Sequence, residues 1–146
     1  MNSSLRDYAL RMLTRREHSV HEFCKKLRKK FPEEDLTALV QEFQDQDWLS
    51  ETRYCEAFIQ HQKISTQAGP FLIHQKLRQK GVADETIKAQ LALHFPEAEQ
   101  AEYIEKLKAK KRPFIKASSD FEREQKLRKY LQGKGYHLEM LNIDER

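Results

Sequence analysis

The chain has few glycines and prolines, the residues that form the turns between strands. It also lacks the long apolar runs of membrane and secreted proteins. Its 146 residues include four glycines and four prolines, too few for the many turns of an all-β fold. No apolar run approaches the ~20 residues needed to cross a bilayer. Arg6, Asp7 and Arg11 interrupt the stretch where a secretory leader would be apolar. We therefore expect a cytoplasmic protein with no membrane contact.

Cysteine is also scarce, with only Cys24 and Cys55 and no Cys-x-x-Cys pair. In a chain without a leader, two distant cysteines are expected to be reduced, buried thiols that pack as small apolar side chains. A structural disulfide between them is the alternative.

Charge, by contrast, is abundant. Charged residues make up 34% and apolar residues 38% of the sequence, and the formal net charge is +4. This composition suits amphipathic helices with broad solvent-exposed faces. The positive charge permits contact with nucleic acid or with an acidic protein surface, but it requires neither.

Apolar residues recur at helical spacing along nearly the whole chain, and capping residues mark helix starts. No stretch alternates with the period of two that a strand requires, so the expected fold class is all-α. The expected helices are 4–15, 20–31 behind a Ser19 cap, a third that begins at Pro32, a fourth behind a Ser50 cap, 70–81, 84–94, 97–111, 120–132, and a short last helix around 138–143.

A basic helix end recurs in the sequence. Residues 76–81, KLRQKG, end the expected fifth helix with a glycine suited to a left-handed cap, and the triplet KLR also stands at 26–28 and 126–128. This recurrence predicts an elongated array of three tandem three-helix repeats, the last one truncated, behind a leading N-terminal helix. The expected units are 1–66, 67–117 and 118–146.

In the third copy, the KLR triplet does not stand at the same distance from the Lys-Gly helix end as in the second. Matching Lys80-Gly81 to Lys134-Gly135 pairs Leu77 with Leu131. The third unit is therefore expected to be offset by about one helical turn relative to the second.

Charge is segregated along the chain. Residues 31–52 hold seven acids and no base, whereas residues 25–30 and 106–112 hold five bases each. Such runs are commonly solvated helix faces. The functional alternative is a set of basic ridges that meet phosphates or an acidic protein surface. The basic stretches contain almost no aromatic residues, which argues against recognition of single strands by base stacking.

Two small clusters could hold a metal, and neither is convincing. They are His18, His21 and Cys24, and Asp45, Asp47 and Glu51. The first has no second ligand pair to complete a tetrahedral shell. The second could bind Mg²⁺ as in a nuclease, but its acids better suit a helix end, a turn and the next helix start. No phosphate-binding glycine loop or nucleophile motif is present, so we expect no enzyme, no cofactor and no metal.

Two neighbouring stretches carry a more specific signal. Residues 48–59, WLSETRYCEAFI, resemble the signature (W/Y)-L-(S/D)-(D/E)-x-R-(F/Y)-x-x-x-(F/Y)-(I/V), and residues 69–82, GPFLIHQKLRQKGV, follow at the matching distance. Residues 10–31 fit the opening segment, and residues 126–141 fit the closing segment K-x-x-x-(F/Y)-L-x-x-(K/R)-G-(F/Y). The chain thus resembles the RecX family, the bacterial regulators of the RecA recombinase.

The resemblance has two departures and a clear functional implication. Ala83 and His137 stand where the family has a serine-type cap, so these two helix starts should each be weaker by about 0.5–2 kcal/mol. The resemblance implies a non-catalytic protein that binds the RecA filament on DNA and restrains filament growth, ATP hydrolysis, strand exchange and co-protease activity. It places the chain in DNA recombination, DNA repair and the SOS response, and we expect it to act as a monomer.

Within the signature, Arg53 has two interpretations. It pairs with an acid such as Glu56 or Asp47 and braces a helix junction, or it contacts a partner. The apolar signature residues expected in the core are Leu49, Tyr54 and Phe58. The expected partner-binding residues are Arg53 together with a basic ridge of Lys25, Lys26, Arg28, Lys29, Lys76, Arg78, Lys80, Lys126, Arg128 and Lys129.

Two other functions remain open at the level of sequence. The same basic ridge could contact DNA phosphates directly, which would make the chain a helical DNA-binding protein that acts without RecA. The chain could also be a helical scaffold for some other partner.

Overall fold

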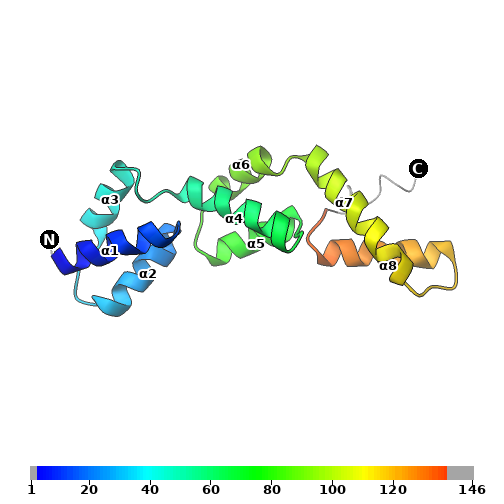
Figure 1. Ribbon diagram of the computed structural model, residues 1–146, viewed down its shortest axis with the longest axis horizontal. Helices are drawn as coiled ribbons and strands as arrows, with labels where there is room; N and C mark the ends of the chain where they lie inside the picture. The colour runs from blue at the N-terminus through cyan, green and yellow to red at the C-terminus, as the bar shows by residue number, and fades with distance from the viewer. Residues whose placement is uncertain (1–2, 138–146) are drawn as a thin grey trace. The chain divides into compact units, whose positions relative to one another are not determined.

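The structure, a computed structural model, describes residues 3–137, and every regular element in that range is a helix (Figure 1). The expected all-α class is therefore confirmed for the described part of the chain. The helix expected around 138–143 lies outside the described residues. The chain divides into two compact units. Unit 1 comprises Met1–Phe58 and Lys76–Gln90, and unit 2 comprises Ile59–Gln75 and Leu91–Arg146.

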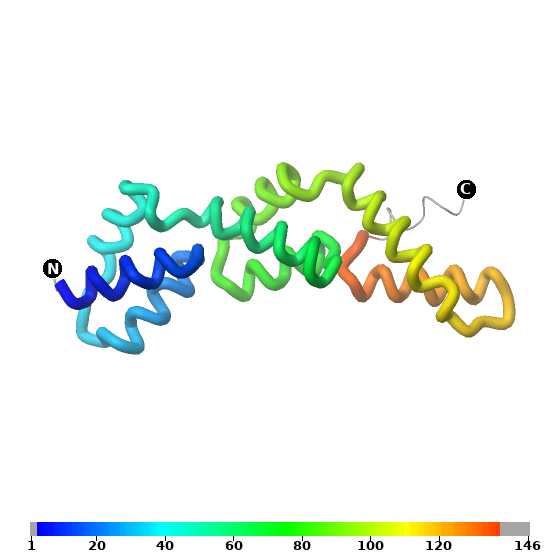
Figure 2. The backbone as a smooth tube through the Cα atoms, in the orientation of Figure 1, coloured from blue at the N-terminus to red at the C-terminus, as the bar shows by residue number. Residues whose placement is uncertain are grey.

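Unit 1 begins with three helices that lie together (Figure 2). They share one apolar core. They are α1 (Ser3–Arg15), α2 (Val20–Lys30) and α3 (Thr37–Asp45). Leu5, Ala9 and Met12 recur every three to four residues, so one face of α1 lies in the core. The other buried residues of this core are Phe23, Cys24, Leu27, Leu36, Leu39, Phe43 and Leu49.

The third helix begins later than the sequence predicted, at Thr37 rather than at Pro32. The Asp35 carboxylate accepts hydrogen bonds from the Thr37 backbone amide at 3.0 Å and from the Thr37 hydroxyl at 2.7 Å. This side chain satisfies an amide that a longer helix would have bonded to a carbonyl. The prediction was wrong because it weighed the proline and the acids of a helix start without this competing side-chain bond.

Three further helices each contribute residues to both units. They are α4 (Glu51–Ser65), α5 (Pro70–Gln79) and α6 (Asp84–His94). At the start of α4, the Ser50 hydroxyl accepts a hydrogen bond from the Arg53 amide at 3.2 Å. The predicted Ser50 cap and the predicted start of α5 at Pro70 are therefore confirmed.

Unit 2 also contains α7 (Glu97–Lys111), a short 3-10 helix η1 (Arg112–Phe114) and α8 (Asp120–Gly133). Phe95 is fully buried, and its ring packs edge-on against Tyr103 and Tyr136 at centroid distances of 5.5 and 6.4 Å. The buried Lys63 amine donates to the His94 carbonyl at 2.8 Å and pairs with Glu99. The lysine charge is thus satisfied inside the unit.

Helices α5 and α8 end in the same way. Each is followed by a glycine with a left-handed backbone, with φ of 82° at Gly81 and 103° at Gly135. The amide after each glycine returns at 3.2 Å to a carbonyl inside the helix, that of Leu77 or Leu131 respectively, as in a Schellman motif. The predicted pairing of Leu77 with Leu131 is confirmed. Helix α8 has 14 residues and α5 has 10, and this difference of about one turn accounts for the predicted offset of the third unit relative to the second.

Candidate functional site

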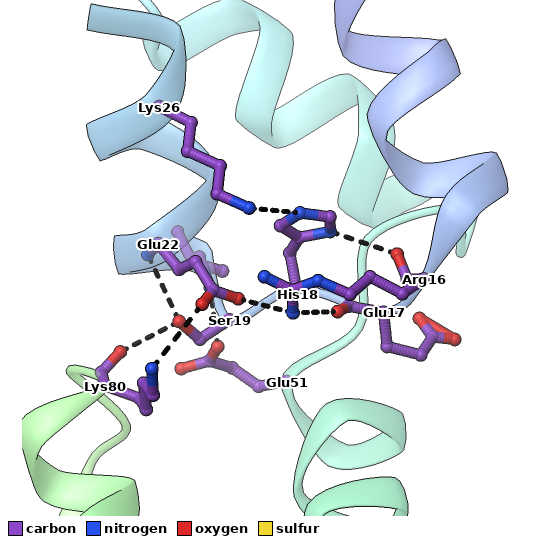
Figure 3. Close-up of polar contacts among 9 residues, drawn as sticks. Arg16, Glu17, His18, Ser19, Glu22, Lys26, Glu51 and Lys80 are labelled. Carbon is purple, nitrogen blue, oxygen red and sulfur yellow. Dashed lines mark hydrogen bonds and ion pairs between the residues drawn. The ribbon is translucent and has the colours of Figure 1, made fainter. Parts of the chain in front are cut away.

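A junction in unit 1 joins the start of α2 to the end of α5 (Figure 3). The hydroxyl of Ser19, the buried N-cap of α2, accepts from the Glu22 amide at 3.1 Å and donates to the Lys80 carbonyl at 2.8 Å. The Glu51 carboxylate, in the first turn of α4, accepts from the Val20 amide at 2.7 Å. The predicted Ser19 cap is confirmed, and the start of α2 ties together residues from α4 and from the end of α5.

Gly81 is required at this junction for two reasons. Its left-handed backbone is one that other residues rarely adopt. A Cβ at this position would also lie 2.4 Å from the Cβ of His21, on the first turn of α2. The helix end therefore approaches α2 so closely that only glycine fits without a shift of the chain.

The Glu22 carboxylate lies between two cations of the junction. It pairs with Arg16 Nη1 at 3.1 Å, and Lys80 Nζ is 3.9 Å away. Burial opposes ionisation of Glu22, but the hydrogen bond and the charge of Arg16 outweigh burial and hold the pKa of Glu22 below its ordinary value. Glu22 is therefore a carboxylate at neutral pH.

His18 is a buried neutral group beside the same junction. Its Nδ1 lies 3.0 Å from the Arg16 carbonyl, and the Lys26 amine lies 3.3 Å from its Nε2. Because the carbonyl can only accept and the ammonium can only donate, Nδ1 carries the hydrogen and Nε2 accepts. Burial lowers the pKa of His18, and the charges of Arg16 and Lys26 lower it further.

Four lysines of unit 1 meet at a cleft of about 260 Å³. Lys25, Lys26 and Lys29 come from one face of α2, and Lys80 comes from the end of α5. All four are exposed. The other lining residues are His21, Glu22 and Gln79. We call this feature the lysine cleft, and it gathers four positions of the predicted basic ridge into one site with a surplus of positive charge.

The remaining ridge residues do not line this cleft. Arg28 is exposed on α2, and Arg78 is exposed on α5, where Lys76 is half-buried. The last three lie on α8 in unit 2: Lys126, Arg128 and Lys129. Lys126 donates to the Lys116 carbonyl at 2.7 Å and pairs with a carboxylate of its own helix at 3.1 Å, so its amine holds the local chain path.

Arg53 makes the contacts of a brace. Its Nε donates to Glu17 Oε2 at 2.8 Å, its Nη1 pairs with Asp47 at 2.9 Å, and its Nη2 donates to the Trp48 carbonyl at 3.3 Å. The hydrogen bond with Glu17 raises the pKa of Arg53 above its ordinary value. The guanidinium thus joins the α1–α2 connection to the α3–α4 turn. Asp47 was one of the two acids predicted as its partner, and Glu17 was not foreseen.

The other sequence predictions for this region concern its core and its chemistry. Of the signature residues, Leu49 and Tyr54 are buried and Phe58 is half-buried. Both cysteines are buried free thiols, as predicted, and burial raises the pKa of Cys55 to about 11. In residues 3–137, no cluster of three or more histidine, cysteine or acidic side chains could hold a metal ion. No helix in the same residues is long and apolar enough to span a membrane.

Unit 2 contains a second junction with a different construction. The amides of Gly69 and Phe71, at the start of α5, donate to the carbonyls of Lys134 and Gly135 at 2.8 and 2.9 Å. A Cβ on Gly69 would lie 2.5 Å from the Gly135 backbone, so this position also needs glycine. The role of Gly69 was not predicted from the sequence. The signal in the sequence was its position. Gly69 directly precedes the first residue of α5, and the equivalent position before α2 is Ser19.

Comparison with known proteins gives a consistent result. The family description "RecX, first three-helix domain" matches residues 6–43, and "RecX, second three-helix domain" matches residues 50–91. Together these matches cover more than half of the chain. They confirm the expected tandem three-helix architecture, whereas the predicted division into 1–66, 67–117 and 118–146 stays a prediction.

Individual relatives agree with the family match. The "Regulatory protein RecX" of Halalkalibacterium halodurans is 34% identical over 129 residues, which are 88% of this chain and 48% of that protein. The protein of the same name from Mannheimia succiniciproducens is 31% identical over 134 residues, or 90% of this chain and 86% of that protein. The chain therefore spans about half of the first relative and most of the second.

The fold is shared with a solved structure. The crystal structure of RecX from Lactobacillus salivarius superposes with a TM-score of 0.84 at 23% identity, over 98% of this chain and 94% of that one. From the two matched domains and the relative covered over most of its length, the chain belongs to the RecX family.

Proposed function

We propose that this chain regulates the RecA recombinase by binding rather than by catalysis, as a monomer. In this role it binds the RecA filament on DNA and restrains filament growth, ATP hydrolysis, strand exchange and co-protease activity. The observation that carries the proposal is the match to both RecX three-helix domains, at 6–43 and 50–91.

The lysine cleft is the surface that we assign to the partner. Lys25 and Lys29 lie one turn apart on α2, and the bond from Ser19 to the Lys80 carbonyl fixes the end of α5 beside them. Because the backbone that carries these lysines is already held, binding orders only their side chains. The lining residues are all polar or charged, so contact is electrostatic and should weaken as salt rises.

One contact of this kind is weak, but a filament presents the same surface many times. The exposed Arg28 and Arg78 carry further charge on the two helices of the cleft. Several weak contacts made by one chain add their free energies, since after the first contact the others are intramolecular. The proposal therefore accommodates inhibition by amounts of protein below those of RecA.

The test is the DNA-dependent ATPase of RecA, titrated with the full chain. We expect suppression at substoichiometric protein, and unchanged ATPase and strand exchange at equimolar protein would overturn the proposal. Lys25→Glu with Lys29→Glu should raise the half-inhibitory concentration by roughly tenfold. The matched control is Arg11→Glu with Lys88→Glu, which changes the charge of exposed residues of unit 1 equally but outside the cleft and should inhibit as the wild type does.

A second candidate is DNA binding without RecA, which the same lysine cleft favours. Lysines are effective point charges for phosphates, and they release counterions from DNA on binding. This candidate predicts tight binding to duplex DNA in the absence of RecA, with affinity that falls steeply as salt rises. If RecA must be present before duplex DNA and the chain associate, the second candidate fails and the first stands.

A further inference from the structure

The connection between α7 and α8 in unit 2 exposes two aromatic rings. Phe114, the last residue of η1, is 79% exposed, and Phe121, in the first turn of α8, is 74% exposed. No other aromatic side chain of the described residues is as exposed. Large apolar side chains left in water contribute little to folding, and where they cluster they mark a binding surface.

Positive charge dominates the segment that contains the two rings, and it is concentrated around Phe114, since Phe121 stands between Asp120 and Glu122. From residue 106 to residue 126 the chain has eight bases and three acids. Lys110, Arg112 and Lys116, which flank Phe114 in sequence, are all exposed. The Arg112 guanidinium does pair with Glu124 at 3.1 Å, but both side chains are 44% exposed. Such solvated pairs are worth little, so the guanidinium can exchange its partner for a phosphate.

A shallow depression of about 400 Å³ lies at the same connection, lined by residues near Phe114 in sequence and by one residue of α8. It is lined by Ala109, Arg112, Pro113, Ile115 and Arg123. Two guanidinium groups and three apolar side chains therefore share one concave surface. Guanidinium planes and aromatic rings are the groups on which unpaired bases stack.

We propose that this surface binds single-stranded nucleic acid. Lys110, Arg112 and Lys116 contact the phosphate backbone, and unpaired bases stack on Phe114 and Phe121. We call these five residues the aromatic–basic surface. The proposal adds a site that the regulation of RecA does not require, and none of its residues belongs to the basic ridge predicted from the sequence. It departs from the expectation that single strands are not recognised by base stacking, because the exposed Phe114 and Phe121 lie just beyond the basic stretch 106–112 on which that expectation was based.

The chemistry of the surface favours this partner over two others. The centre of a protein interface is a continuous apolar patch depleted of lysine, whereas here lysines and arginines interleave with the rings. Duplex DNA offers phosphates but keeps its bases stacked on each other, so exposed phenylalanines would gain nothing from it. A single strand offers both the charge and the base faces.

The test measures fluorescence anisotropy of a labelled oligothymidine with the full chain in the absence of RecA. Wild type should bind the single strand more tightly than a duplex of equal length. Phe114→Ala and Phe121→Ala should each weaken single-strand binding by roughly fivefold or more and leave the salt dependence unchanged. Lys110→Glu with Lys116→Glu should instead make the affinity less sensitive to salt.

The control is Phe71→Ala, also in unit 2. Phe71 is 57% exposed, its ring stacks on His137 at 5.1 Å, and it lies outside the basic segment. This variant should bind the oligothymidine as the wild type does, and all three phenylalanine variants should keep the wild-type melting temperature. The proposal is overturned if single and double strands bind equally, if Phe114→Ala and Phe121→Ala bind normally, or if Phe71→Ala is equally impaired. Because RecA is absent, none of these results bears on RecA regulation.

Discussion

The helix ends at Gly81 in unit 1 and at Gly135 in unit 2 have the same backbone geometry. They are bonded to the neighbouring helix start by different groups. In unit 1 the buried Ser19 hydroxyl bonds the Lys80 carbonyl. In unit 2 the backbone amides of Gly69 and the following helix start bond the carbonyls at the helix end directly. A side-chain bond can be removed without moving the backbone, whereas a backbone bond fails only when the chain path shifts. The unit 1 junction can therefore be weakened by point mutation of Ser19, and its neighbours Glu22 and His18 titrate. The unit 2 junction depends on Gly69 having no side chain.

The largest effect is expected from Gly69→Ala. The added Cβ would lie 2.5 Å from the Gly135 carbonyl carbon and oxygen and 2.7 Å from the Tyr136 amide nitrogen, all backbone atoms that cannot rotate away. We expect the free energy of unfolding to fall by about 3 kcal/mol. Chemical denaturation with unchanged m-value would measure it.

Gly133→Ala is the matched control for this substitution. Gly133 ends α8, and a Cβ there meets nothing within 4 Å. Alanine should therefore stabilise the protein by about 0.5–1 kcal/mol, because glycine loses more backbone entropy in a helix. If both variants lose stability equally, close backbone approach is not what makes Gly69 necessary.

The next effect is expected from Ser19→Ala. This change removes the cap of α2 and leaves the Lys80 carbonyl without its hydroxyl donor, so unfolding should become easier by about 2 kcal/mol. Ser119→Ala removes the same cap bond, to the Glu122 amide at 3.1 Å, from an exposed position at the start of α8. It should cost about 1 kcal/mol. Equal losses would mean that the bond to Lys80 adds nothing to the junction.

A smaller effect should appear with pH. The pKa of His18 is below its ordinary value of 6.5 in the folded chain, so the unfolded chain binds this proton more readily. The contribution of His18 to stability is therefore complete above pH 6.5 and is lost as pH falls below it. Glu22 also stabilises the fold less as the pH falls. Because its pKa is lowered from 4.5, its contribution is lost only below pH 4.5.

The measurement for His18 compares melting temperatures at about pH 7.5 and pH 5.5 for wild type and for His18→Asn. Asparagine keeps a donor for the Arg16 carbonyl and does not titrate. The drop in melting temperature on acidification should be smaller in the variant. An identical drop in both proteins would show that other groups carry the pH dependence.

The smallest effect is expected from the arginine braces. Arg53→Met removes the pairs with Glu17 and Asp47, and since the arginine is 37% exposed we expect a loss of about 1 kcal/mol or less. Arg112→Met removes one pair, with Glu124, from an arginine that is 44% exposed, and should change the unfolding free energy by only a few tenths of a kcal/mol. A larger loss for Arg112 would reverse the order that exposure predicts.

Helix ends were predictable because their chemistry is local. The caps at Ser19 and Ser50 and the glycine at Gly81 each involve residues within a few positions of each other, and the structure confirms all three. The start at Pro32 failed for the same local reason, since Asp35 competes for the Thr37 amide. Here an aspartate that bonds the first amide of the helix outweighed the proline.

The site itself was only partly predictable. The sequence marked Lys25, Lys26, Lys29 and Lys80 as a basic ridge, but the bond that brings Lys80 to α2 joins residues 61 positions apart. The salt bridge from Arg53 to Glu17 spans 36 positions. No local pattern specifies such pairs, because they depend on how separate helices pack. Likewise, only burial distinguishes Phe114, which the structure exposes, from an apolar core residue.

The central claim is that the lysine cleft binds RecA filaments on DNA, and a direct binding titration tests it best. Labelled wild-type chain, the Lys25→Glu and Lys29→Glu double variant, and the Arg11→Glu and Lys88→Glu control would each be titrated with preassembled filaments. We expect the cleft variant to bind roughly tenfold more weakly than both of the others. Equal binding by all three proteins would contradict the assignment of the cleft, and no binding by the wild type would contradict the proposed function.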